Sequence, residues 1–153
     1  MVEPAPLTLR DRRLKAAVSA IVTDGFDRFL LVKRRNPPLP AFHAFPGGRV
    51  EDGEDRQAAV LRELAEETGV TGTDPVFFAR YRLPEQGFEI TVFRVSTDPR
   101  THMAARARDD AQELGWYRLE DALRLDLPPS MRDCLWRLNR NRAMPGPGNL
   151  DID

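Results

Sequence analysis

One stretch of this 153-residue chain predicts a helix more strongly than any other, and it runs from about Asp55 to Thr68. Apolar or small residues recur there at three- and four-residue spacing, the pattern of a helix with one buried face: Ala58, Leu61, Leu64, Ala65 and Thr68. Gly69 follows, where a left-handed helix cap is favoured. A helix of this kind needs a hydrophobic surface supplied by the rest of the chain.

Short apolar runs on both sides of this helix predict strands. Residues 16–23 and 29–32 flank an Asp-Gly turn and predict a hairpin, and residues 76–83 and 88–95 flank the segment PEQG and predict a second one. One more strand is expected over residues 114–118. Between the first hairpin and the helix, the prolines and glycines of RRNPPLPAFHAFPGG predict a shaped loop without a regular element.

A last helix is predicted near the C-terminus. Its buried stripe consists of Met131, Cys134, Leu135 and Leu138, and Ser130 is the expected N-cap. The arginines of this helix are interleaved with Asp133 and an apolar seam, which favours an ordinary solvated face over a nucleic-acid stripe. Strands mixed with at least two helices predict an α/β or α+β domain.

Composition narrows the functional classes. The 24 acidic and 23 basic residues nearly cancel, so no global field favours nucleic acid or a membrane as a partner. One cysteine, Cys134, and two histidines are too few for a disulfide or a closed zinc site. Without a signal-peptide pattern, a reduced cytoplasmic setting is expected. We predict an N-terminal tail (1–15), one domain (16–142) and a disordered C-terminal tail (143–153).

Three glutamates on the first helix predict a metal site. Glu63, Glu66 and Glu67 fall on one face, because each helical residue turns about 100°, and we expect their carboxylates to converge. A merely solvated acidic face is the alternative, since like charges at these spacings cost only about 0.2–0.5 kcal/mol per pair. Hard oxygen ligands suit Mg²⁺ or Mn²⁺, and magnesium usually shares its ligands with substrate phosphates. The cluster thus indicates a phosphate-bearing substrate.

The same region follows the pattern G-x5-E-x7-R-E-U-x-E-E-x-G-U, where U is bulky and aliphatic, with these matches: Gly48, Glu54, Arg62, Glu63, Leu64, Glu66, Glu67, Gly69 and Val70. This pattern resembles the signature of Nudix hydrolases. The resemblance extends to FLLVKRR, FPGG and LGWYRLEDAL, so it covers most of the chain. It implies an α/β/α sandwich around a mixed β-sheet, and hydrolysis of a nucleoside diphosphate linked to another moiety.

The resemblance also implies roles for individual residues. Glu63, Glu66, Glu67 and the backbone carbonyl of Gly47 are the expected metal ligands. Arg62 cannot ligate a metal, but its planar fork can hold a carboxylate, so we expect it to orient Glu54 or Glu63. Glu54 itself is expected to act at or beside the metal.

The general base is less well defined by the pattern. In this family it lies in the motif or in a loop before the last strand, where Glu113 is favoured over Asp109 and Asp110. Glu51 lies in the loop before the helix, and the sequence leaves open whether it acts at the site or is simply exposed to solvent. His43 stands where many relatives have tryptophan, and we expect it to pack as a neutral side chain; Trp116 is expected in the core.

The substrate is a small-molecule nucleotide by the same resemblance. Pro84 and the segment RRNPP resemble members that cleave ADP-ribose, although a proline in LPEQG also suits a hairpin turn. ADP-ribose or a related nucleotide sugar is the leading prediction. A nucleoside triphosphate pyrophosphohydrolase and a nucleotide-binding regulator without catalysis are the alternatives. Association into a homodimer through the hairpins or the last helix is left open.

Overall fold

The computed structural model of the protein describes residues 14–34, 42–108 and 111–143. Nearly all of the two predicted tails, residues 1–13 and 144–153, lies outside this part of the chain, as does most of the RRNPP segment. None of the helices in the described ranges combines the length and the apolar character that crossing a membrane requires.

The strands form two sheets. The larger is mixed, with the order β4-β1-β6-β5, and contains β1 (Lys15–Ile21), β4 (Gly47–Arg49), β5 (Gly72–Leu83) and β6 (Phe88–Thr97). In it β1 runs parallel to β6 and antiparallel to β4. The smaller sheet is antiparallel, with the order β3-β2-β7, and contains β3 (His43–Ala44), β2 (Arg28–Arg34) and β7 (Ala111–Arg118).

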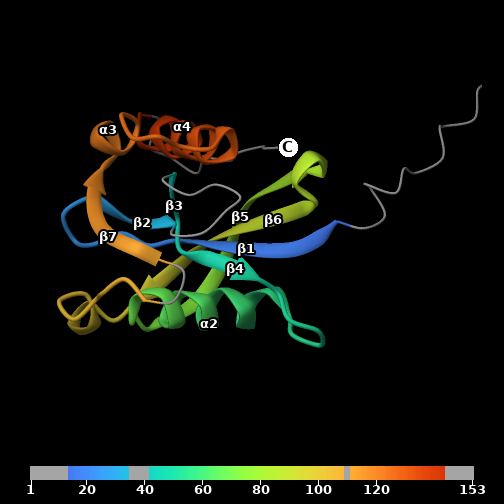
Figure 1. The fold of residues 1–153 in the computed structure, drawn as a ribbon. Helices are drawn as coiled ribbons and strands as arrows, with labels where there is room; N and C mark the ends of the chain where they lie inside the picture. Colours follow the sequence, from blue (N-terminus) through green and yellow to red (C-terminus); the bar gives the residue numbers. More distant parts are fainter. Residues whose placement is uncertain (1–13, 35–41, 109–110, 144–153) are drawn as a thin grey trace, which may run out of the picture.

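Helices cover the sheets on opposite sides. The helix α2 (Arg56–Thr68) lies below the strands in Figure 1, whereas α3 (Leu119–Ala122) and α4 (Pro129–Ala143) lie above them. One hydrophobic core, which includes Val18, Leu30 and Leu64, packs between the strands and α2. The other core includes Leu31 and Leu135 and packs under α3 and α4. The predicted α/β/α sandwich around a mixed sheet is confirmed.

Helix α2 begins and ends where the sequence predicts. The Asp55 carboxylate accepts a hydrogen bond from the Ala58 N–H (2.7 Å) and caps the first turn, and Gly69 ends the helix with a left-handed φ of 78°. The predicted buried face was partly wrong, because Ala58 and Ala65 are exposed while Glu67 is buried. The helix is turned so that this glutamate faces the strands.

The hairpin predictions had different outcomes. Strands β5 and β6 pair antiparallel across the short 3-10 helix η1 (Pro84–Gln86), as expected. The prediction of a first hairpin, in which residues 16–23 pair with residues 29–32, was wrong. The turn between them exists and carries an isolated bridge between Thr23 and Phe29. Both edges of β1 are occupied by β4 and β6, so β2 pairs with β3 and β7 in the other sheet.

Two further predictions are corrected by the structure. The segment before α2 is not free of regular elements, because β3 and β4 lie within it; strands of two and three residues are too short to show a period. Ser130 is not the N-cap of the last helix. Helix α4 begins at Pro129, and the Arg132 N–H donates to the Pro128 carbonyl (3.1 Å), so Ser130 lies inside the first turn. Its predicted stripe is buried.

Candidate active site

Helix α2 and strand β4 meet at a pair of glycines. The Gly47 N–H donates to Oε1 of Glu67 (3.0 Å), whose side chain is buried and leaves the residue only 3% exposed. Gly48 lies against Glu63 so closely that a β-carbon at this position would collide with the Glu63 carboxylate. Two glutamates of α2 therefore contact these glycines, and the lack of a side chain at Gly48 leaves room for Glu63.

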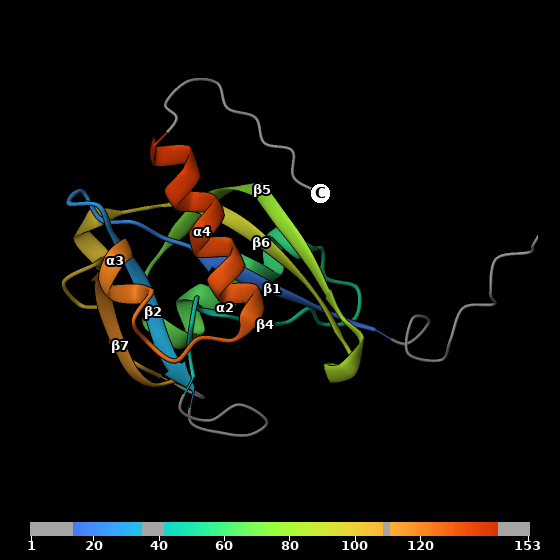
Figure 2. The same ribbon diagram turned by 90° about the horizontal axis from the view of Figure 1, so that it is seen from above.

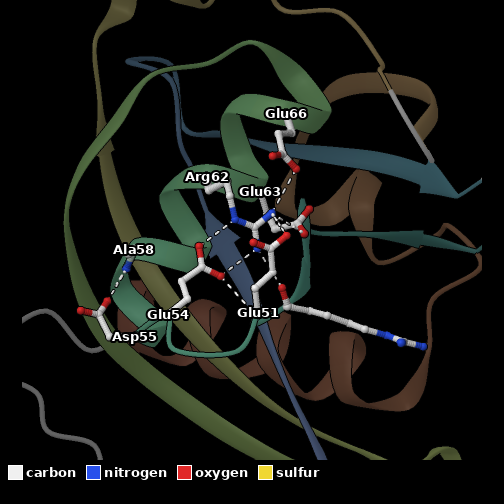
Figure 3. Close-up of polar contacts among 8 residues, drawn as sticks. Glu51, Glu54, Asp55, Ala58, Arg62, Glu63 and Glu66 are labelled. Atoms are coloured by element: carbon white, nitrogen blue, oxygen red, sulfur yellow. Dashed lines mark hydrogen bonds and ion pairs between the residues drawn. The ribbon is translucent and has the colours of Figure 1, made fainter.

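Arg62 is the centre of the hydrogen-bond network on the outer side of this junction (Figure 3). Its Nε and Nη2 donate to the two oxygens of Glu54, at 2.7 and 2.9 Å. Its Nη1 donates to Glu63 (3.2 Å) and Glu66 (3.1 Å), and Nη2 also donates to the Arg49 carbonyl (3.0 Å). One guanidinium thus orients three glutamates and ties α2 to β4.

The contacts between Arg62 and Glu54 keep this ion pair charged. The hydrogen bonds from Arg62 lower the pKa of Glu54 to about 2, with help from the Glu51 N–H, which donates to Glu54 at 2.9 Å. The hydrogen bond to Glu54 in turn raises the pKa of Arg62. Glu51 is itself largely solvated, since its side chain is 69% exposed and its carboxylate lies 3.8 Å from Arg62.

The three expected metal ligands do not all converge. Within the described ranges, no three His, Cys, Asp or Glu side chains lie close enough together to hold a metal ion. Glu66 turns outward to Arg62, whereas Glu63 and Glu67 line a cleft beside Gly47 and Gly48. Pairing with Arg62 offsets the repulsion that crowded carboxylates would otherwise feel.

The residues at this junction nevertheless fit a hard divalent cation. Two carboxylates and a glycine backbone stand together at one end of the cleft, and oxygen donors of this kind suit Mg²⁺ or Mn²⁺ rather than softer metals. At Gly48 the missing side chain leaves the room that the Glu63 carboxylate occupies. The ligand set expected from the sequence therefore stays a proposal that the local chemistry supports.

The cleft has a volume of about 520 Å³ and lies between the larger sheet and α4. Its acidic end is formed by Gly47, Gly48, Glu63 and Glu67. Farther from α2, strands and helix supply mostly apolar side chains: Tyr81, Leu83, Phe88, Ile90, Val92, Met131 and Cys134. Figure 2 shows α4 passing over the sheet beside β5 and β6. Ser130, Met131 and Cys134 of α4 line the cleft and form its roof. The cleft is thus charged at one end and apolar at the other.

A polar contact joins the apolar wall to the roof. The Tyr81 hydroxyl on β5 donates to Asp133 on α4 (2.7 Å), and Nε of Arg137 donates to the same carboxylate oxygen (2.9 Å). The Arg137 guanidinium lies 5.6 Å from the centre of the Tyr81 ring. Burial and the hydrogen bond to Asp133 raise the pKa of Tyr81, so its hydroxyl remains a donor.

The remaining predicted site residues lie elsewhere. Glu113 is exposed on β7, opposite Lys33 on β2, and does not line the cleft. Asp109 and Asp110 lie outside the described residues. The preceding Arg108 donates its N–H to the Glu67 carbonyl (2.9 Å), which brings this loop to the end of α2.

The two aromatic predictions can also be placed. The ring of His43 packs edge-on against Tyr117, with centroids 5.8 Å apart, and burial lowers its pKa, as expected for a neutral packing side chain. Trp116 is only partly buried against the core under α2. Pro84 begins η1 and serves as a turn residue, while its neighbours Leu83 and Gln86 line the cleft.

Several cleft residues were missed by the sequence reasoning. Arg49, Tyr81 and Phe88 line the cleft, but they stand in segments that the pattern describes only as strands or loop. The alternation of side chains in the hairpin could have placed Tyr81, Phe88 and Ile90 on one face. No pattern in the sequence indicates that α4 covers that face.

The fold and the site together define an α/β protein of the Nudix type, and the comparisons agree. The NUDIX domain pattern matches residues 13–138. The chain is 31% identical over 122 residues to the ADP-ribose pyrophosphatase of Methanocaldococcus jannaschii, covering 69% of this chain and 66% of that protein. It is 32% identical over 77 residues to the 8-oxo-dGTP diphosphatase of Escherichia coli, covering 50% and 57%.

A solved structure supports the same conclusion for the fold. The crystal structure of a NUDIX hydrolase from Nitrosomonas europaea has a TM-score of 0.77 and 21% identity, covering 88% of this chain and 75% of that one. The chain belongs to the NUDIX domain family. Its matches span less than two thirds of the length of the two curated relatives.

Proposed function

We propose that this protein hydrolyses the pyrophosphate bond of a nucleoside diphosphate linked to another moiety, and that its substrate is ADP-ribose or a related nucleotide sugar. The observation that carries the proposal is the junction of α2 and β4, where every glutamate of the complete motif is oriented by Arg62 or by the Gly47 backbone. The choice of ADP-ribose rests on the 122-residue similarity to a protein of that activity.

The metal would be held at the acidic end of the cleft by Glu63, Glu67 and the Gly47 carbonyl, with Glu66, which contacts Arg62 outside the cleft lining, as the further expected ligand. A bound Mg²⁺ or Mn²⁺ supplies charge neutralisation at the phosphoryl oxygens and a more acidic water. Arg62 keeps Glu54 ionised and holds the carboxylates of Glu54 and Glu63 in position, because its planar guanidinium donates to oxygens of both. The long cleft then binds the rest of the nucleotide.

The general base is tested separately. The sequence favours Glu113, but its place on β7 outside the cleft lining gives the opposite expectation. We expect Glu113→Gln to change kcat by less than about threefold and to leave KM unchanged, because Glu113 lies away from the cleft. Removal of a true general base would lower kcat on the order of 10²-fold or more. A kcat loss of that size with unchanged KM would return the role to Glu113.

Nucleoside triphosphates are the second candidate substrates. Similarity to an 8-oxo-dGTP diphosphatase at comparable identity favours them, although that similarity covers only half of this chain. The two reactions differ in their products. Water attack on ADP-ribose breaks one P–O bond of the bridge and yields AMP and ribose 5-phosphate, whereas a triphosphate yields a nucleoside monophosphate and pyrophosphate.

The experiment is a substrate panel with Mg²⁺ or Mn²⁺. It contains ADP-ribose, other nucleotide sugars, dinucleoside polyphosphates, and ordinary and oxidised triphosphates. We expect ADP-ribose to rank among the best substrates by kcat/KM and to be untouched in excess chelator. A triphosphate that is better by more than about tenfold, or ~1.4 kcal/mol of transition-state binding, would overturn the ADP-ribose assignment. Tight nucleotide binding without any product would indicate a regulator instead.

A further inference from the structure

The charged side chains along the cleft are unevenly distributed. Among the described residues that line it, Glu63 and Glu67 are the acidic ones and Arg49 is the only one with a positive charge. A pyrophosphate brings two or more negative charges into this space. Metal ions at the acidic end can neutralise part of that charge, and Arg49 is the cation that the lining itself provides.

Among the described residues, Arg49 is not paired with another charged group. Within the described part of the chain its guanidinium forms no ion pair, in contrast to Arg62, which contacts four carboxylates. Instead it lies 5.3 Å from the centre of the Phe88 ring on β6. Its backbone is held in place, because its carbonyl accepts a hydrogen bond from Arg62 (3.0 Å). The side chain is exposed and available to an anion.

The sheet register places this guanidinium between the two ends of the cleft. Arg49 is directly opposite Ala17 on β1, and Ala17 is opposite Ile90 on β6, so the three share the face that forms the cleft floor. Arg49 comes one residue after Gly48 at the acidic end, and its guanidinium reaches over β1 to Phe88 at the apolar end. Ala17 is small and leaves the floor open between them.

We propose that Arg49 is a substrate-binding residue that holds the phosphate next to the nucleoside, with Phe88 fixing its position and the apolar end of the cleft taking the base. The proposal rests on the proposed function and names the phosphate and the base subsite of the same cleft. A guanidinium suits this role because its planar donors match two phosphate oxygens at once. A base with apolar faces suits the floor of Phe88 and Ile90 under Met131.

The test compares nucleotides with nucleosides in the absence of metal. Calorimetry in excess chelator measures the dissociation constants of AMP and adenosine, and of GMP and guanosine, for the wild type and for Arg49→Ala. We expect the wild type to bind at least one monophosphate about tenfold more tightly than its nucleoside, because hydrogen bonds between charged groups are stronger than neutral ones. Arg49→Ala should abolish this preference without changing nucleoside binding.

Matched variants separate the contact from general effects. Arg80→Ala is the control, because Arg80 also lies over an aromatic ring, Phe77 at 5.4 Å, but does not line the cleft. It should leave the preference unchanged. Arg49→Lys should restore only part of it, because lysine lacks the planar fork. Phe88→Leu should weaken monophosphate binding about two- to fivefold through loss of the ring beneath the guanidinium, while Phe77→Leu should not.

Failure of this inference differs from failure of the proposed function. If the wild type shows no preference for either monophosphate, or if Arg49→Ala retains that preference, Arg49 does not hold the phosphate, whatever the protein hydrolyses. Equal losses for nucleotide and nucleoside would indicate a structural effect and would also overturn the assignment. If the preference depends on Arg49 but no pyrophosphate is cleaved, the subsite stands and the hydrolase proposal fails.

Discussion

The two ends of the cleft are built in different ways. The acidic end consists of one contiguous segment, in which α2 and β4 are joined by short hydrogen bonds through Arg62 and Gly47. The apolar end is assembled from the β5–β6 hairpin and from α4, which lies about thirty residues farther along the chain, and a hydrogen bond from Tyr81 to Asp133 joins its wall to its roof. This difference suggests that chemistry and substrate choice can vary independently.

The largest effect is expected at the acidic end, from Glu67→Gln. An amide keeps the oxygen that accepts from Gly47 N–H, so the fold should survive, but it carries no charge for a metal or for phosphoryl transfer. We expect kcat to fall on the order of 10²- to 10³-fold, with an unchanged circular dichroism spectrum. Glu120→Gln, exposed on α3, is the control. Near-native turnover in Glu67→Gln would remove Glu67 from the site.

Arg62→Ala should have the next largest effect. It leaves Glu54, Glu63 and Glu66 without the donor that orients them, and we expect kcat to fall about 10- to 100-fold, as for other groups that support metal ligands. Arg62→Lys should restore little of the lost kcat, because lysine lacks the planar fork of donors. Arg100→Ala is a matched control, because Arg100 makes the same two-donor contact with Asp98 on the surface. Full rescue by lysine would show that charge alone matters.

A smaller and different effect is expected at the apolar end. Tyr81→Phe removes the hydroxyl that joins β5 to α4 and should loosen the wall against the roof. A hydrogen bond of about 1 kcal/mol net corresponds to roughly fivefold in KM, and kcat should not change. Tyr117→Phe, whose ring packs against His43 outside the cleft lining, is the comparison. If Tyr81→Phe lowers kcat by the same factor by which it raises KM, the two ends of the cleft are not independent.

The smallest effect concerns the pH dependence of stability. The pKa of Glu54 is lowered from its ordinary value of 4.5 to about 2 by Arg62, so its ionised form stabilises the fold fully above about pH 4.5. This contribution is lost as the pH falls through 2. Urea unfolding of the wild type and Glu54→Gln should show a stability difference that is constant at neutral pH and shrinks from about pH 4.5 downward. A constant difference down to pH 2.5 would refute the pairing.

The parts of the fold that were predicted correctly depend on neighbours in the sequence. Asp55 and Gly69 cap α2 through contacts within a few residues, and the β5–β6 hairpin closes over a short turn. The error in the first hairpin concerns partners at long range. The Asp-Gly turn after β1 predicted pairing with β2, but β4 and β6 occupy both edges of β1.

The site divides along the same line. The motif, through the family resemblance that it carries, was sufficient to predict the class of reaction and the pairing of Arg62 with Glu54 or Glu63. The inward turn of Glu67 could not be read from the spacing of the motif. It depends on the Gly47 N–H, which belongs to another element.

By itself, the sequence determined α2 with its caps, the acidic motif, and hence the family and the class of reaction proposed here. Only the tertiary structure decided which glutamates face the cleft, that Arg49 lies over Phe88, and that α4 roofs an apolar floor. The physical reason is that helix periodicity and capping are local, whereas a cleft exists only where strands and helices from distant segments pack against each other.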